Sequence, residues 1–229
     1  MRVYISQSNF MPWWGFWTTL EAVDLYVIYD TVQFTHRDWR TRNRILQDSQ
    51  QRWLSVPVHG SRTSAINQVL VADNTWTGNH IQRLRHAYGK KVDKQALEII
   101  EDAYLRVGNL PLLTLVNETL LRHIARAFDV TTTILRSETF NVQGSPSERL
   151  AQIANAVGAR EYVTGEAARA YLAVEPFERC GITVNSIQFP GAEDSRARMS
   201  ILHSLLVQGL SATRQQVHHS PVTLTVWNS

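Results

Sequence analysis

Short apolar runs rich in β-branched residues alternate along the chain with longer segments of helical periodicity. Five of these runs have the length and composition of buried strands. They cover residues 2–6, 25–29, 132–135, 161–164 and 182–188. Strands that alternate with helices are typical of α/β proteins with a parallel sheet. We therefore expect these five strands to form one mainly parallel sheet.

Helical periodicity is most regular between residues 74 and 129, in the interval between the second and third predicted strands. Asn74 is the expected N-cap of the first helix in this interval, and Gly89 is its expected end. Two more helices are expected over residues 93–107 and 111–128, because their apolar positions recur every three or four residues. We expect residues 74–129 to form a helical excursion that packs against the sheet.

The remaining predicted helices are shorter, and turn residues mark several of their ends. The sequence SPSE at residues 145–148 has the spacing of a capping box, so a helix should begin there. Gly209 is expected to end the last helix. The expected spans are residues 14–23, 145–158, 167–171, 176–180 and 196–207.

These elements predict a single α/β domain over residues 1–210, followed by a C-terminal tail over residues 211–229. The tail is polar at first and contains the apolar run VTLTVW near its end. A hairpin is expected between residues 45 and 58, with its turn at the polar sequence DSQQ. The sequence contains no internal repeat and no low-complexity segment.

Composition restricts the class of protein. The 229 residues are 44% hydrophobic, which suffices for a core, but no apolar run is long enough to span a membrane. The first strand begins at once, which argues against a signal peptide. A formal net charge of +3 is too small to imply nucleic-acid binding. Cys180 is the only cysteine, so we expect a reducing cytoplasm and a buried structural thiol.

Common catalytic motifs are absent from the sequence. It lacks the phosphate-binding pattern G-x-x-x-x-G-K-[ST], the dinucleotide pattern G-x-G-x-x-G, the metalloprotease pattern H-E-x-x-H and paired C-x-x-C motifs. Its histidines show no metal-ligand spacing. The sequence therefore indicates no metal site and leaves any cofactor unidentified.

Polar residues follow the predicted strands at the positions where a ligand would bind. Gln7 follows the first strand, and Asp30 follows the second with Gln33 close behind. Gly165 and Glu166 follow the fourth strand. Ligands of parallel sheets bind just beyond the carboxyl ends of the strands, so the four polar side chains should share one cleft. Asp30 could act as a base there, although Gln7 and Asp30 also fit hydrogen-bonded turns.

Arginines alternate along the loop after the second strand. In an extended chain Arg40, Arg42 and Arg44 would lie on one face, with Trp39 and Asn43 on the other. Positive charges this close repel one another unless an anion or carboxylates neutralise them, and the guanidinium fork suits phosphate. An anion site and a solvated face both fit the pattern. In the first case Arg42 and Arg44 should point toward the cleft.

Aromatic residues add a second kind of candidate. Trp13 and Trp14 lie in the turn after the first strand, where a tryptophan ring could stack on a nucleotide base or a sugar. Packing in the core is the alternative for at least one of them. Tryptophans beside arginines would suit a ligand that combines a ring with phosphate groups.

The N-terminal blocks resemble those of a known family. The patterns Q-x-x-F-x-P-W-x-G-F, VDLYVIYDTVQF, R-D-W-R-T-R-N-R-I and W-L-S-V-P-V are similar to those of the WbqC-like family. The matching residues include Gln7, Phe10, Pro12, Gly15, Asp30, Gln33, Phe34, Trp39, Arg42, Asn43, Arg44, Trp53, Pro57, Trp76, His80 and Gly165. The resemblance covers roughly residues 1–209. The sequence departs from the family pattern at Ser8, where proline is usual, and at Thr31 and His203, where aspartate is usual.

The resemblance implies a bacterial enzyme of surface-polysaccharide (O-antigen) biosynthesis. Such a transferase would attach an acyl or aminoacyl group, such as glycyl, to a nucleotide-linked amino sugar. Asp30 would then deprotonate the attacking amine, with Gln7 and His80 as further catalytic residues. Together with the strand-end and aromatic candidates, the expected substrate-binding residues are Gln33, Trp39, Arg42, Asn43, Arg44, Gly165, Glu166 and Trp14. The expected partners are a small nucleotide-linked substrate and, in one arrangement, a second copy of the chain to form a homodimer.

A fainter likeness connects the chain to HIGH-type nucleotidyltransferases and pantothenate synthetase-like ligases, and it implies a Rossmann-like sheet of the HUP type. Those enzymes share the order strand, Pro/Gly turn, helix, strand, but the turn here holds Trp13, Trp14 and Phe16 in place of their catalytic histidines. Two alternatives to the transferase therefore stay open. One is a nucleotide-dependent ligase or adenylyltransferase, and the other is a non-catalytic module that binds a sugar nucleotide or a partner.

Overall fold

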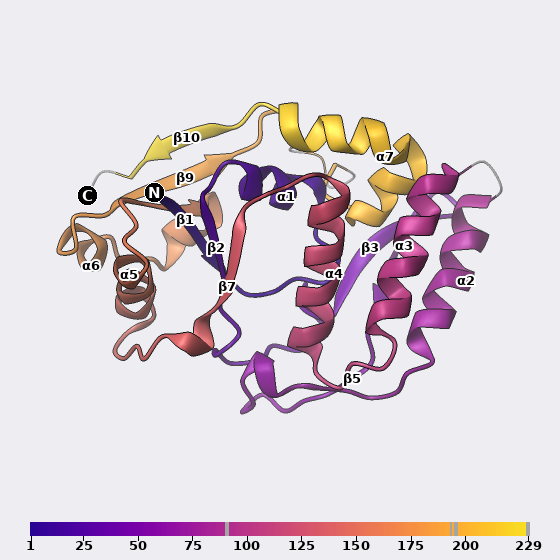
Figure 1. The fold of residues 1–229 in the computed structure, drawn as a ribbon. Helices are drawn as coiled ribbons and strands as arrows, with labels where there is room; N and C mark the ends of the chain where they lie inside the picture. Colours follow the sequence, from indigo (N-terminus) through magenta and orange to yellow (C-terminus); the bar gives the residue numbers. More distant parts are fainter. Residues whose placement is uncertain (90–91, 193, 195–196, 228–229) are drawn as a thin grey trace.

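The computed structural model describes residues 1–89, 92–192, 194 and 197–227. A six-stranded sheet in the order β10-β9-β8-β1-β2-β7 runs through its centre (Figure 1). The strands are β1 (Arg2–Ser6), β2 (Leu25–Ile28), β7 (Thr133–Arg136), β8 (Glu161–Gly165), β9 (Thr183–Gln188) and β10 (Thr223–Val226). All neighbours are parallel except β10, which pairs antiparallel with β9. The predicted mainly parallel sheet of five strands is confirmed.

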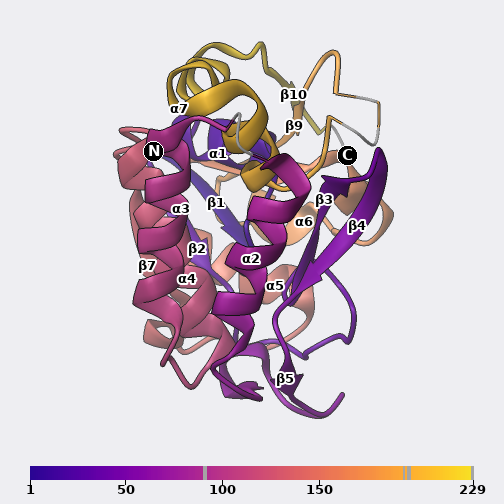
Figure 2. The same ribbon diagram turned by 90° about the vertical axis from the view of Figure 1, so that its right-hand side faces the viewer.

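Seven α-helices accompany the sheet in the described part of the chain. They are α1 (Trp14–Glu21), α2 (Trp76–Tyr88), α3 (Lys94–Val107), α4 (Leu113–Ala127), α5 (Pro146–Ala156), α6 (Glu175–Glu178) and α7 (Ile201–His219). Figures 1 and 2 show α2, α3 and α4 side by side, beyond one side of the sheet. These three helices correspond to the predicted excursion.

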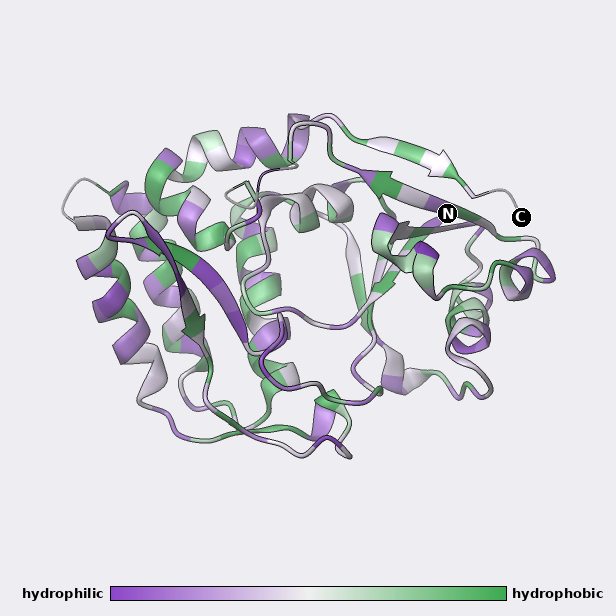
Figure 3. Cartoon of the chain, turned by 180° about the vertical axis from the view of Figure 1, so that it is seen from behind, coloured by the Kyte–Doolittle hydropathy of each residue, from purple (hydrophilic) through white to green (hydrophobic). Residues whose placement is uncertain are grey.

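Alternate residues of the central strands contribute to two hydrophobic cores. On β2, Tyr26 and Ile28 face the larger core, which also contains side chains of α1, α4 and α7. Leu25 and Val27 face the smaller core, which contains side chains of α5 and α6. Strand geometry requires this alternation. Figure 3 shows hydrophobic and hydrophilic residues alternating along the helices, as expected for helices with one buried face.

The predicted hairpin is present beside the sheet. Strands β3 (Arg42–Gln47) and β4 (Gln50–Ser55) pair antiparallel, with Arg44 opposite Trp53. Asp48 and Ser49 form the turn with φ values of 52° and 60°. Positive φ at both turn residues matches the right-handed twist of a two-residue hairpin. A second short pair, β5 (Val58–His59) with β6 (Leu70–Val71), follows it.

Several local predictions were wrong. The N-cap of α2 is Thr75 rather than Asn74, because Asp73 Oδ1 accepts hydrogen bonds from the amide (2.8 Å) and hydroxyl (2.7 Å) of Thr75. The expected helix at residues 167–171 is a 3-10 turn over Glu166–Ala170. The thiol of Cys180 is exposed rather than buried, since the short helix before it buries only Pro176 and Phe177.

The C-terminal segment is more ordered than its polar composition suggested. Gly209 adopts φ 83° and ψ 169° and interrupts the helix, but α7 continues beyond this kink to His219. The continuation buries Thr213 and Val217, and β10 then pairs with β9. The expected start of this helix, residue 196, lies outside the described residues. No helix in the described ranges is long and apolar enough to cross a membrane.

The capping box at the start of α5 gives a first testable prediction. The Ser145 hydroxyl accepts from the Glu148 amide at 3.3 Å, and Glu148 Oε2 accepts from the Ser145 amide at 2.8 Å. Replacing Ser145 with alanine should lower the free energy of unfolding by about 1 kcal/mol, because one helix-end amide loses its acceptor. Urea unfolding measures the change. Ser211→Ala, at an exposed helical position, is the control and should not destabilise.

Candidate functional site

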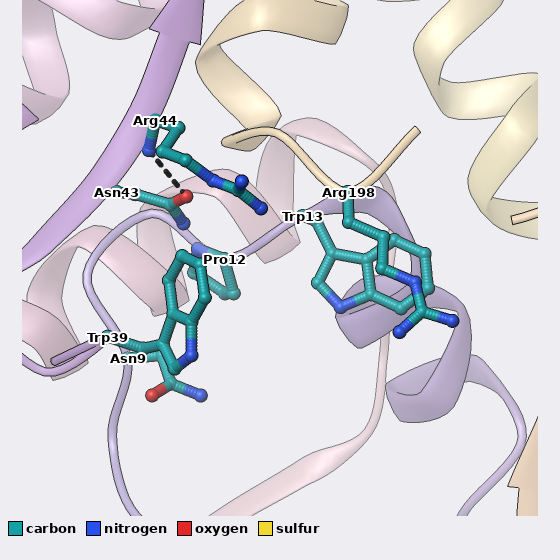
Figure 4. A pocket seen from close by; sticks show the side chains of 7 residues that line it. All are labelled: Asn9, Pro12, Trp13, Trp39, Asn43, Arg44 and Arg198. Carbon is teal, nitrogen blue, oxygen red and sulfur yellow. Dashed lines mark hydrogen bonds between the residues drawn. The ribbon is translucent and has the colours of Figure 1, made fainter. Parts of the chain in front are cut away.

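A pocket of about 430 Å³ lies between the turn after β1, strand β3 and the segment before α7 (Figure 4). We call it the tryptophan pocket. Its lining residues are Asn9, Pro12, Trp13, Trp39, Asn43, Arg44 and Arg198. Two of them are tryptophans, two are arginines, and none of the described lining residues is acidic. Ring faces beside fixed positive charges suit an anion that carries a flat ring.

Hydrogen bonds from Asn43 and Ser200 fix the walls of this pocket. The buried Asn43 amide donates to the carbonyl oxygens of Phe10 (3.2 Å) and Met11 (2.8 Å). The Ser200 hydroxyl donates to the same Met11 carbonyl at 2.9 Å, and the Ser200 amide donates to the Arg44 carbonyl at 2.9 Å. The first turn, β3 and the start of α7 are therefore tied together before any ligand binds.

Arg44 is held among aromatic rings at the edge of the pocket. Its Cζ lies 5.3 Å from the Trp39 ring centroid and 5.8 Å from that of Trp53. Its Nη1 donates to Gln51 Oε1 at 2.7 Å, whereas its buried Nε has no partner. Arg42 lies on the same face of β3 with its Cζ 4.0 Å from the Trp53 ring, but it does not line the pocket. Trp39, expected on the opposite face, lies against Arg44.

A second pocket, of about 610 Å³, opens beyond the carboxyl ends of β1, β2 and β8. We call it the strand-end pocket. It is lined by Tyr4, Ile5, Ser6, Gln7, Asn9, Tyr29, Val32, Gln33, Thr35, Arg40, Pro146, Arg149, Leu150, Tyr162, Thr164, Gly165, Ala167, Ala168 and Tyr171. Three predicted site residues, Gln7, Gln33 and Gly165, are therefore brought together here. The Gln33 amide already donates to the Arg62 carbonyl at 2.7 Å.

The strand-end pocket lies at the point in the sheet where the chain changes the direction in which it adds strands. After β1 the chain adds β2 and β7 on one side of the sheet, and then β8 and β9 on the other. The connections after β1 and β8 therefore diverge, which opens a crevice between these two strands. Parallel α/β sheets bind their ligands at such a position.

A third pocket, of about 490 Å³, surrounds Glu166. We call it the Glu166 pocket, and it is lined by Trp13, Gly165, Glu166, Ala167, Ile187, Gln188, Phe189, Pro190 and Arg198. The Glu166 carboxylate accepts from Gln188 Nε2 at 3.1 Å and forms an ion pair with Arg169 at 2.6 Å. The predicted side chain Glu166 thus lies at the sheet edge, but in a different pocket from Gln7.

Shared residues connect the three pockets into one groove. Asn9 lines both the tryptophan pocket and the strand-end pocket. Trp13 and Arg198 line both the tryptophan pocket and the Glu166 pocket, while Gly165 and Ala167 line the Glu166 and strand-end pockets. Among the residues that the structure describes, no group of three or more His, Cys, Asp or Glu side chains could hold a metal ion.

Asp30 does not line this groove, so the expectation of a cleft shared with Gln7 was wrong. The carboxylate is fully buried and accepts from the Ser8 amide (2.8 Å), the Ser8 hydroxyl (2.7 Å) and the Thr114 hydroxyl (2.6 Å). Burial raises the pKa of Asp30, and the hydrogen bonds from Thr114 and Ser8 offset part of the rise. Successive strand residues face opposite ways; Tyr29 therefore faces the groove and Asp30 faces α4.

His80 also lies away from the groove, within the core. Its Nδ1 is 3.3 Å from the Tyr104 hydroxyl and its Nε2 is 3.0 Å from the Ser55 carbonyl oxygen. Phe10 and Trp76 pack against the ring. Burial lowers the pKa of His80 to about 4. This environment fits a neutral structural histidine that links α2 to β4 and α3.

Some of the residues that line the groove differ from those predicted from the sequence. Trp14 is buried at the start of α1, and Trp13 lines the groove in its place. Arg198, Arg149 and Tyr29 line the groove but were not among the sequence candidates. Two of them carried a usable signal, because Tyr29 ends a predicted strand and Arg149 follows a predicted helix start. Arg198 had none, since it comes from a loop remote in sequence.

Comparisons with known proteins match the chain to one family model and to one curated relative. The family model described as "WbqC-like protein family" matches residues 7–215. The chain is 31% identical over 196 residues to the "Uncharacterized protein Rv1507c" of Mycobacterium tuberculosis (strain ATCC 25618 / H37Rv), and the match covers 84% of each chain. No solved structure is significantly similar.

Proposed function

Because the chain belongs to the WbqC-like protein family, we propose that it is a transferase that acylates a nucleotide-linked amino sugar in surface-polysaccharide (O-antigen) synthesis. The group transferred would be an acyl or aminoacyl group such as glycyl. The amine nitrogen attacks the acyl carbon of an activated donor and forms an amide bond. The bond between that carbon and the leaving group breaks, and the amine loses one proton. We place the reaction in the cytoplasm, where a chain with one cysteine needs no disulfide.

The tryptophan pocket is the observation that carries this proposal. Arg44 lies 5.3 Å from the Trp39 ring and Arg198 lies 5.5 Å from the Trp13 ring, so each positive charge has an aromatic face beside it. A nucleotide sugar offers a base for stacking and a diphosphate for the guanidinium forks. We assign the diphosphate to Arg44 and Arg198, and the base to a tryptophan ring.

The order of the strands supports a nucleotide ligand. Numbered along the chain, the five parallel strands follow the order 3-2-1-4-5 across the sheet. This is the order of doubly wound, Rossmann-like nucleotide-binding sheets. Of the helices that connect the parallel strands, α1 and α4 pack against one face of the sheet and α5 and α6 against the other, as in such folds. We therefore favour the Rossmann-like assignment, including its HUP variant.

We propose that the carboxylate of Glu166, rather than that of Asp30, binds the attacking amine. It is the only acidic side chain among the described residues that line the three pockets. The Glu166 pocket shares Trp13 and Arg198 with the tryptophan pocket, so one extended ligand could contact both. A carboxylate can hold an ammonium group and accept its proton when the amine attacks.

Replacing Arg44 with alanine should weaken binding of a nucleotide sugar by about 10- to 100-fold. One charge-assisted hydrogen bond to phosphate contributes about 1.5–3 kcal/mol. Isothermal titration with uridine- and thymidine-diphosphate sugars and amino sugars measures the change. Arg52→Ala is the matched control, because Arg52 belongs to the same hairpin but lines none of the three pockets. Equal affinities of folded wild type and Arg44→Ala would remove Arg44 from the site.

The strand order also favours a second candidate function, a nucleotide-dependent ligase or adenylyltransferase. That enzyme would consume ATP and release pyrophosphate, whereas the transferase would form the amide from a donor activated beforehand. Incubation with ATP, glycine and an amino-sugar nucleotide, followed by a pyrophosphate assay and mass spectrometry, separates the two. Ligands that bind but stay unaltered would indicate a non-catalytic binding module.

A further inference from the structure

The hydroxyl of Tyr29 is an unpartnered polar group at the strand-end pocket. Tyr29 is only 7% exposed, yet its side chain lines this pocket. Among the described residues its hydroxyl has no hydrogen-bond partner. A buried hydroxyl without a partner costs free energy, so a group that accepts its hydrogen bond would be stabilised there.

Arg149 supplies a free positive charge beside this hydroxyl. Its buried Nε lacks a hydrogen-bond partner, and its guanidinium forms no ion pair with any described residue. Tyr29 and Arg149 line the same pocket. Burial raises the pKa of Tyr29, and the charge of Arg149 acts against this rise. Arg40 brings a second guanidinium to the same pocket; its Nη1 lies 3.6 Å from Asp38 Oδ2, whereas its Nε is buried and unpartnered.

The N-terminus of α5 adds to the positive potential. Pro146, the first residue of α5, lines the pocket, and Arg149 lies at the end of the first turn. The N-terminal end of a helix carries a partial positive charge that favours anions. Glu148, the acidic residue of this turn, is occupied by the Ser145 amide and does not line the pocket. No described lining residue of the strand-end pocket is acidic.

We propose that the strand-end pocket is a second anion subsite, in which Arg149, Arg40 and the Tyr29 hydroxyl bind carboxylate or phosphate oxygens of the second reactant. The inference rests on the proposed function in one respect, because a transferase needs a donor as well as the nucleotide-linked acceptor. Asn9 lines both this pocket and the tryptophan pocket, so the two ligands would lie next to each other. The groove would then bring an anionic donor to the nucleotide sugar.

Titration of the full chain with inorganic phosphate, and separately with glycine, tests the subsite. For whichever of the two probes binds to wild type, Arg149→Gln should weaken the binding by about tenfold or more, because a charged hydrogen bond is lost. Tyr29→Phe keeps the ring and its packing, and should weaken binding by about two- to tenfold. Arg160→Gln is the matched control, because it removes an exposed arginine that precedes β8 at the opposite edge of the sheet. Phosphate binding would indicate a phosphorylated donor, whereas glycine binding would indicate an unactivated carboxylate, as the ligase would use.

Two results would overturn the inference. Wild type could bind neither probe, or Tyr29→Phe and Arg149→Gln could both bind the probe as wild type does while they remain folded. Titrating the same variants with nucleotide sugars separates this inference from the proposed function. If phosphate binding depends on Arg149 but no nucleotide sugar binds, the proposed function fails and the subsite stands. If nucleotide sugars bind through Arg44 but neither probe binds, only the subsite fails.

Discussion

Replacing Asp30 with alanine should destabilise the protein by about 3–5 kcal/mol. Three donors from two separate elements converge on this buried carboxylate: the Ser8 amide, the Ser8 hydroxyl and the Thr114 hydroxyl. A buried donor that loses its acceptor costs about 1–3 kcal/mol. Alanine also avoids the cost of burying a carboxylate, so the expected loss is less than three full penalties.

Urea unfolding of Asp30→Ala beside Asp24→Ala measures this effect. Asp24 accepts a hydrogen bond from the Arg2 amide at the opposite, exposed ends of the same two strands, and its loss should cost about 1 kcal/mol. An Asp30→Ala protein as stable as wild type but inactive would contradict the structural role. That result would support the catalytic role that the sequence predicted for Asp30.

Lowering the pH from neutral to about 4 should remove about 3 kcal/mol of stability through His80 alone. Its pKa is about 4 in the folded protein and about 6.5 in an unfolded chain. Between these values the unfolded state binds a proton that the folded state does not, so stability falls as the pH falls. One pKa unit corresponds to about 1.36 kcal/mol.

The difference in pH dependence between wild type and His80→Gln isolates this contribution. The pKa values of His123 and His203 are also lowered, chiefly by burial, but both histidines are present in both proteins. The variant should be less stable at neutral pH because the ring packing is lost, and its stability should fall less steeply on acidification. Parallel pH profiles would show that His80 titrates normally.

The sheet was predictable because its signals are local. Each central strand is a short β-branched run, and the capping box at residues 145–148 marks a helix start in four residues. The C-terminal segment was less predictable. Gly209 does break the helical geometry, but buried Thr213 and Val217 hold the chain helical beyond it. The pairing of β10 with β9 depends on a partner strand that local sequence does not reveal.

The carboxyl edge of the sheet was predicted correctly as a place, but the direction of each side chain was not. Ser6 lies opposite Ile28, so Gln7 is in register with Tyr29, and Ser8 with Asp30. The sequence showed polar residues after both strands. It did not show that Gln7 and Asp30 differ by one position in this register and therefore face opposite sides of the sheet. Ser8 stands where the family pattern usually has proline, and proline could provide neither of the two donors that reach Asp30.

The central position of β1 has a consequence for folding. Its contact with β2 joins residues 22 apart, whereas its contact with β8 joins residues 159 apart. The first contact can form early during synthesis, but the other edge of β1 must wait until most of the chain has left the ribosome. The strand-end pocket lies between β1 and β8 and therefore exists only after this late pairing. A small molecule that binds there would bind only chains in which this late pairing is complete, and it would stabilise them against unfolding.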